Sequence, residues 1–174
     1  TELQTPDSAG TMSAMATGAK TRAGMISVGQ SMARKDCTGL KDGTLLTLWE
    51  LAAAAGMETG VITTTRLTHA TPAATLAHVP DRNWESDGDV PKKARQLGCT
   101  DIAQQMITNS YGRGAKVLMG GGRVNFMPAS QSDPEYPDVK GRRKDGRDLI
   151  AEWQQRHRHG AYVWNAAQLA AAPP

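Results

Sequence analysis

The sequence has 174 residues, a formal net charge of +3 at pH 7, 39% hydrophobic residues and two cysteines. This length is enough for one domain with a hydrophobic core. No apolar run is long enough to cross a bilayer, so the sequence predicts no membrane span.

In the first half of the chain, helices and one strand are predicted in turn. Small residues over 8–20 predict a helix that ends near Gly24. Thr44 is expected to cap a helix over 45–55, and Gly56 is a natural residue to end it. The β-branched run over 60–65 predicts a buried strand.

The second half continues the alternation. Thr71 is expected to cap a helix with Pro72 at its first position, and Thr100 to cap a helix over 101–109. Further elements are a strand over 115–119, a tight Gly turn over 120–122, an irregular surface loop over 131–146, a helix over 148–157, a strand over 161–164 and a helix capped by Asn165.

This alternation predicts an α/β fold. We expect a three-layer sandwich with a largely parallel central sheet and helices on both faces. Sites in such sheets form beyond the carboxyl ends of the strands, so the strand over 61–65 would deliver residues 66–71 to the edge of a site. No internal repeat interrupts this pattern.

Basic residues concentrate between positions 140 and 158. They are Lys140, Arg142, Arg143, Lys144, Arg147, Arg156 and Arg158. Such a cluster is one sign of nucleic-acid binding. Acidic residues are interleaved with it, at Asp138, Asp145, Asp148 and Glu152. We therefore favour a solvated surface loop whose charges compensate one another, without specific nucleic-acid binding.

Ser8 follows Asp7 at the start of the first predicted helix. Free N–H groups and a partial positive charge at a helix N-terminus stabilise an alkoxide or a phosphate oxygen, which suits a nucleophile. The same residues also occur as an ordinary cap and first turn.

Several ordered motifs resemble the alkaline phosphatase family. They are Pro6-Asp7-Ser8-Ala9-Gly10, the segments 63–73 and 77–78, Asp81-Arg82-Asn83-Trp84-Glu85, the segment 118–123, Asp133-Pro134-Glu135-Tyr136-Pro137 and Tyr162-Val163-Trp164-Asn165. The resemblance covers nearly the whole chain. It implies an enzyme that hydrolyses phosphate monoesters at alkaline pH with two zinc ions and one magnesium ion per complete subunit.

The resemblance assigns roles to three residues of the proposed catalytic centre. Ser8 matches the nucleophile, which is activated by zinc and becomes phosphoserine. Arg82 matches the residue that binds substrate phosphate through a planar guanidinium, although an Arg in a loop is also commonly solvated. Asp7 is similar to the residue that holds this Arg in place, and it would cap the helix as well.

Metal ligands are implied at three further positions. His69 and Thr71 match a magnesium-binding pair, and their two-residue spacing in an extended segment would place both side chains on one face. A hydroxyl suits magnesium, whereas imidazole also suits zinc. Glu135 matches a calcium ligand of animal-type members, with a solvated Glu as the alternative. His78 is expected to be structural.

The cysteines and the ends of the chain complete the expectations. Cys37 and Cys99 pack as two buried thiols or, as the resemblance implies, form a disulfide typical of periplasmic or secreted proteins. Residues 1–174 are expected to form part of a single catalytic domain that lacks N- and C-terminal portions and most metal ligands. The complete protein would be a homodimer.

Two rival functions remain at this point. A sulfatase or phosphodiesterase of the same superfamily would share the fold, but Arg82 and His69-Ala70-Thr71 follow the phosphatase pattern. A noncatalytic binding fragment is the rival of another class, since the sequence alone does not supply the ligands for two zinc ions.

Overall fold

The computed structural model describes residues 6–109, 111 and 114–172, and forms an α/β arrangement in that part of the chain. The two ends of the expected 1–174 domain, residues 1–5 and 173–174, lie outside the described residues. The α-helices are α1 (Ser8–Thr17), α2 (Leu40–Gly43), α3 (Leu48–Ala54), α4 (Ala70–Ala73), α5 (Lys92–Gln96), α6 (Ile102–Thr108), α7 (Leu149–Arg156) and α8 (Ala166–Ala170). Short 3-10 helices span Asp87–Asp89 and Arg123–Asn125.

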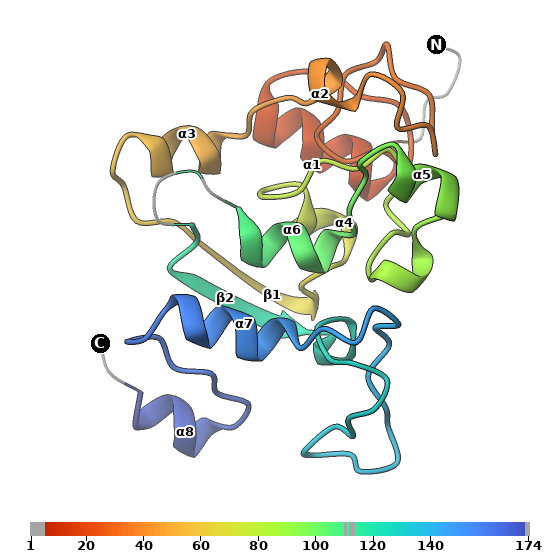
Figure 1. Cartoon of the computed structure of the whole chain (residues 1–174). Helices are drawn as coiled ribbons and strands as arrows, with labels where there is room; N and C mark the ends of the chain where they lie inside the picture. Colours follow the sequence, from red (N-terminus) through yellow and green to blue (C-terminus); the bar gives the residue numbers. More distant parts are fainter. Residues whose placement is uncertain (1–5, 110, 112–113, 173–174) are drawn as a thin grey trace.

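Strands β1 (Gly60–Arg66) and β2 (Val117–Gly121) pair in parallel at the centre of the described fold. Their register joins Val61 to Leu118, and it shifts before Arg66 meets Gly121. Helices α3, α4 and α6 lie on one side of this pair, and α7 and α8 on the other (Figure 1). The parallel sheet between helices confirms the predicted α/β class.

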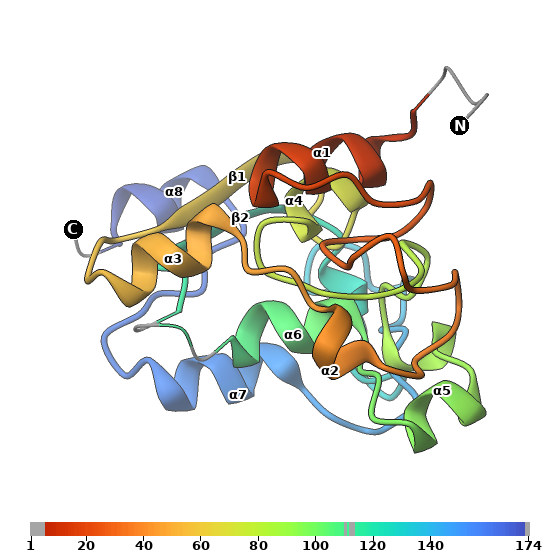
Figure 2. The ribbon, with the colours of Figure 1, turned by 90° about the horizontal axis from the view of Figure 1, so that it is seen from above.

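The hydrophobic core is built largely of small residues around α4. Ala70, Ala73, Ala74 and Ala77 are at most 1% exposed, which lets the helix approach its neighbours closely. Trp84 and Ile102, the first residue of α6, belong to the same hydrophobic core. Helix α1 packs against α4, and the two lie next to each other when the molecule is seen from above (Figure 2).

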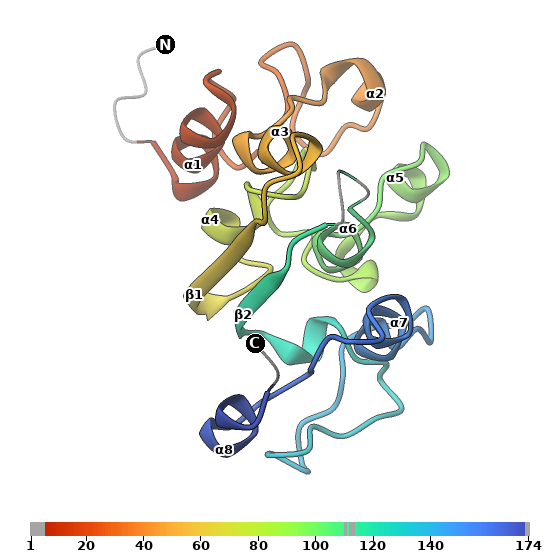
Figure 3. The ribbon, with the colours of Figure 1, turned by 90° about the vertical axis from the view of Figure 1, so that its left-hand side faces the viewer.

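Strand β1 is less buried than predicted. Val61 is buried, but Ile62 is 75% exposed and most other positions of the strand are also open to solvent. Within the described residues only β2 pairs with β1, so the other edge of β1 has no strand beside it (Figure 3). The β-branched composition predicted the strand correctly but not its exposure.

Three predicted caps are displaced. Thr47, not Thr44, caps α3, because it forms a reciprocal capping box with Glu50. Asp101, not Thr100, caps α6 through a bond from the amide of Gln104. His69, not Thr71, is the N-cap of α4.

The ends of the chain give two more corrections and one confirmation. Helix α1 stops at Thr17, because Gly18 adopts φ +73° and closes it, before the expected end at residue 20. Segment 161–164 is not a strand; its last amide, that of Trp164, donates to the side chain of Gln168. Asn165 caps α8 as predicted.

Candidate active site

Asp7 and Ser8 form the N-terminus of α1. The Oδ1 atom of Asp7 accepts a hydrogen bond of 2.9 Å from the amide of Gly10, which is the geometry of an N-cap. Ser8 is therefore the first residue of a ten-residue helix, and it is half-buried. The expected cap role of Asp7 is confirmed by this bond.

Arg82 reaches the same place from a loop after α4. Its guanidinium donates from Nη1 to Oδ2 of Asp7 at 3.0 Å, and its Nη2 lies 3.2 Å from Nε2 of His69. The side chains of Arg82 and Asp7 are 22% and 28% exposed, so both remain accessible to a small ligand. Three segments distant in sequence thus meet at one point.

The charge of Asp7 is stabilised by these contacts. Burial alone would raise the pKa of its carboxyl group, but the amides of Gly10 and Gly24 and the guanidinium of Arg82 outweigh that effect. The net pKa lies below the ordinary value, so Asp7 is ionised at neutral and alkaline pH.

The pKa of His69 lies below its ordinary value. Burial lowers its pKa, and the positive charges of Arg82 and Arg66 lower it further. Its Nδ1 atom is buried and has no hydrogen-bond partner among the described residues. Because a guanidinium only donates, Nε2 of His69 accepts from Arg82, and a neutral ring then carries its proton on Nδ1. The ring could bind a metal ion through Nε2 only after exchanging Arg82 for the ion.

The prediction from the two-residue spacing assumed that His69 and Thr71 lie in one extended segment, but they do not. His69 is extended, but Thr71 is the second residue of α4 and is exposed. The spacing argument for one common face is therefore wrong. In the described part of the chain, no three His, Cys, Asp or Glu side chains gather as a group that could hold a metal ion.

Glu135 lies in a separate cluster near α8. Its carboxylate pairs with Arg123, whose guanidinium also binds Asp133 at 2.7 Å. Arg123 lies 5.9 Å from the ring centre of Trp164. Glu135 is thus engaged in an ion pair and is not simply solvated. Among the described residues, no hydrogen bond or ion pair joins this cluster to Arg82.

The expected disulfide is present. Cys37 and Cys99 are joined across a sequence separation of 62 residues, and both are buried. The bond ties the loop before α2 to the turn between α5 and α6. The loop before α2 also carries Arg34, whose guanidinium pairs with Asp81, the residue before Arg82.

His78 belongs to a buried network, in agreement with a structural role. Its Nδ1 lies 3.0 Å from the carbonyl oxygen of Ser27, and its Nε2 lies 2.8 Å from Glu50. Burial would raise the pKa of Glu50, but the hydrogen bond and charge of His78, the amide of Thr47 and the side chain of Asn109 lower it overall. The network joins α3 to the segment after α4.

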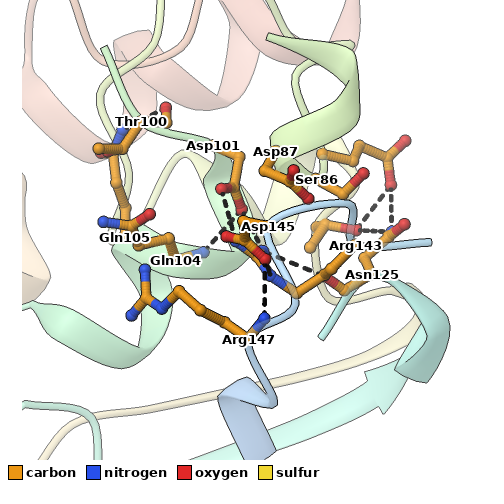
Figure 4. A network of polar contacts seen from close by, with 12 residues as sticks. Ser86, Asp87, Thr100, Asp101, Gln104, Gln105, Asn125, Arg143, Asp145 and Arg147 are labelled. Carbon is orange, nitrogen blue, oxygen red and sulfur yellow. Dashed lines mark hydrogen bonds and ion pairs between the residues drawn. The ribbon is translucent and has the colours of Figure 1, made fainter. Parts of the chain in front are cut away.

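The basic cluster is not wholly a solvated surface loop. Arg143 is 0% exposed and binds Asp101 and Asp145 through paired hydrogen bonds (Figure 4). Its sequence neighbour Arg142 has a side chain 50% exposed and pairs with Asp89. The prediction holds for Arg142 and is wrong for Arg143, which fastens the loop to the N-terminus of α6.

One contributor to the site was missed by the sequence analysis. The amide of Gly24 donates to Oδ2 of Asp7 at 2.9 Å, and its carbonyl oxygen accepts the amide of Arg82 at 2.8 Å. Gly24 forms these bonds with its backbone atoms, which every residue has, so its residue type does not predict the role. The one available sign was that a Gly in a loop often adopts positive φ.

Comparison with known proteins places the chain in a family. Residues 1–173 match the family model described as alkaline phosphatase. The tissue-nonspecific alkaline phosphatases of rat and human are 40% and 38% identical, over all of this chain and 34% of theirs. The chain belongs to the alkaline phosphatase family, and it spans about a third of the length of these curated relatives.

Solved structures agree with the fold. Alkaline phosphatase from Thermus thermophilus matches with a TM-score of 0.63 and 27% identity, over 95% of this chain and 26% of that one. The cold-active enzyme from a psychrophilic Shewanella matches with a TM-score of 0.61 and 28% identity, over 96% and 30%. No helix in the described residues is long and apolar enough to cross a membrane.

Proposed function

We propose that the protein containing this chain hydrolyses phosphate monoesters at alkaline pH through a phosphoserine on Ser8. The observation that carries the proposal is the 3.0 Å contact between Arg82 and Asp7, which places a guanidinium beside the residue that precedes Ser8. Membership of the alkaline phosphatase family supports the substrate class. The relatives and solved structures described above are alkaline phosphatases by name, which favours this function over a sulfatase or a phosphodiesterase.

The residues of this chain divide the work. Two oxygens of the substrate phosphate bind the N–H groups of Arg82 that Asp7 leaves free, which orients the phosphorus atom and offsets charge in the transition state. The hydroxyl group of Ser8 loses its proton to solvent, its oxygen attacks phosphorus, the ester P–O bond breaks, and the departing alkoxide takes a proton from water. A second water then attacks phosphorus of the phosphoserine, the Ser8 O–P bond breaks, and a proton of that water passes to the oxygen of Ser8 as inorganic phosphate leaves.

The donor groups fit the metals of the family in part. Ser8 would hold zinc, and His69 and Thr71 would hold magnesium, for which Nε2 of His69 would first exchange its partner Arg82 for the ion. Zinc at Ser8 would supply ionisation of the hydroxyl group. Glu135 would hold calcium only after exchanging its partner Arg123 for the ion.

The remaining proposals concern the whole protein. Residues 1–174 would form part of a single catalytic domain. The complete protein would be a homodimer in the periplasm or outside the cell. The disulfide supports that location, because such bonds persist in oxidising compartments.

A substrate panel tests the proposed function. The full-length protein, supplied with zinc and magnesium, should hydrolyse p-nitrophenyl phosphate at alkaline pH far faster than bis(p-nitrophenyl) phosphate or p-nitrophenyl sulfate. The isolated chain of residues 1–174 should show no activity above background. Preference for the diester or the sulfate would contradict the proposal in favour of the rival enzymes.

A further inference from the structure

Gly24 contacts both members of the Asp7–Arg82 pair. Its amide donates to Oδ2 of Asp7 at 2.9 Å, the oxygen that also accepts from Nη1 of Arg82 at 3.0 Å. Its carbonyl oxygen accepts from the backbone amide of Arg82 at 2.8 Å. These three bonds form a closed ring that fixes Arg82 at its backbone and at its side chain.

The backbone conformation at this position favours glycine, and the guanidinium of Arg34 lies against it. Gly24 is buried and has φ +75°, a conformation that residues with a side chain rarely adopt. A Cβ atom added there would lie 2.6 Å from Cζ of Arg34. The guanidinium of Arg34 therefore covers the backbone of Gly24 directly.

Arg34 also holds the residue before Arg82. Its Nη2 lies 3.3 Å from Oδ1 of Asp81, whose side chain is 1% exposed. That Oδ1 atom accepts from the amide of Asn83 at 3.0 Å, and so it shapes the turn that carries Arg82. The ammonium group of Lys35 adds a weaker ionic contact at 3.8 Å from Oδ2.

We propose that Gly24 and Arg34 are positioning residues for Arg82 and hold its guanidinium ready for a phosphate group. The inference rests on the proposed function, in which Arg82 binds substrate phosphate. A guanidinium fixed before binding loses little freedom when phosphate arrives, so affinity depends on this support. Arg34 acts through Asp81 and Gly24 and does not touch the substrate.

The experiment compares four variants of the full-length protein. Gly24→Ala should weaken inhibition by inorganic phosphate about 10- to 100-fold, because it displaces the ring. Arg34→Gln should weaken it about fivefold, the upper range for a partly exposed ion pair. Arg34→Lys, which keeps the charge beside Asp81, should restore most of the affinity. Arg142→Gln is the matched control, since it removes an Arg of similar exposure that pairs with an Asp elsewhere.

Two readouts separate positioning from a general loss of stability. The inhibition constant for phosphate should rise more than kcat for p-nitrophenyl phosphate falls. Hydrogen exchange, measured by mass spectrometry in the peptide that contains Arg82, should become faster in Arg34→Gln and Gly24→Ala and stay unchanged in Arg142→Gln.

Exchange is independent of catalysis, so it distinguishes the two failures. If the protein does not hydrolyse phosphate monoesters, the proposed function fails, and faster exchange in Arg34→Gln then shows only that Arg34 fixes the segment of Arg82. Phosphate inhibition and exchange in Arg34→Gln equal to those in Arg142→Gln would overturn the inference. A fall in kcat with an unchanged phosphate inhibition constant would overturn it too.

Discussion

Replacement of Arg143 by Met should destabilise the protein strongly. All five N–H groups of this guanidinium face acceptors. Two bonds go to Asp101 at 2.9 and 3.2 Å, two to Asp145 at 3.1 and 2.5 Å, and a longer one of 3.4 Å goes to the carbonyl oxygen of Asn125. Burial alone would lower the pKa of Arg143, but the two carboxylates raise it well above its usual range, so the charge is permanent.

The cost follows from what remains after the change. Asp101 is 1% exposed and, among the described residues, would keep only the amide of Gln104 as a donor, while Asp145, 28% exposed, can regain water. Breaking a buried ion pair from one side typically costs about 3–5 kcal/mol. Most of that cost therefore falls on Asp101, and the N-terminus of α6 should loosen with it.

Urea unfolding followed by tryptophan fluorescence measures this effect. Arg143→Met should lower the unfolding midpoint by on the order of 2 M, given typical urea dependences. The matched control is Arg142→Met, which removes an Arg–Asp pair with side chains 50% and 25% exposed and should cost at most about 1 kcal/mol. Equal midpoints for the two variants would refute the assignment of Arg143 as a buried anchor.

Three further predictions address the disulfide, the buried acid and the phosphate ligand. Replacing Cys37 and Cys99 together by Ser should lower the free energy of unfolding by about 4 kcal/mol, measured by thermal or urea unfolding, because the bond closes a long loop. The pKa of Glu50 is lowered in the folded chain, so its stabilisation is present above its unfolded pKa of about 4.3 and is lost as the pH falls through the folded value. Glu50→Gln should therefore flatten the acid limb of a plot of unfolding midpoint against pH, and an unchanged limb would exclude this role. Arg82→Ala should cost about 1.5–3 kcal/mol in phosphate affinity, measured as inhibition by inorganic phosphate, with zinc content unchanged.

Local sequence signals predicted most of the helices but displaced several starts. Thr44 and Thr47 are both suitable residue types for the cap of α3, but only Thr47 is followed three residues later by a Glu, which is Glu50. That spacing is the capping box and was visible in the sequence. Thr71 before Pro72 looked like a cap, yet the backbone turns into helix two residues earlier, at His69.

Long-range pairing set the limit of prediction. Arg143 and Arg142 look alike in a loop of alternating charges, and only the fold brings Asp101, 42 residues away, against one of them. The meeting of Asp7, His69 and Arg82 likewise depends on the packing of α1 against α4. Family resemblance supplied that grouping, whereas composition and periodicity did not.

The central claim is that Ser8 is the nucleophile. The most direct test is to quench the full-length protein with acid during turnover of labelled phosphate monoester, or after incubation with labelled phosphate, and to map the label by mass spectrometry. The account predicts one phosphate on the peptide that contains Ser8, absent from the Ser8→Ala variant. Label on another residue, or undiminished turnover in Ser8→Ala, would contradict it.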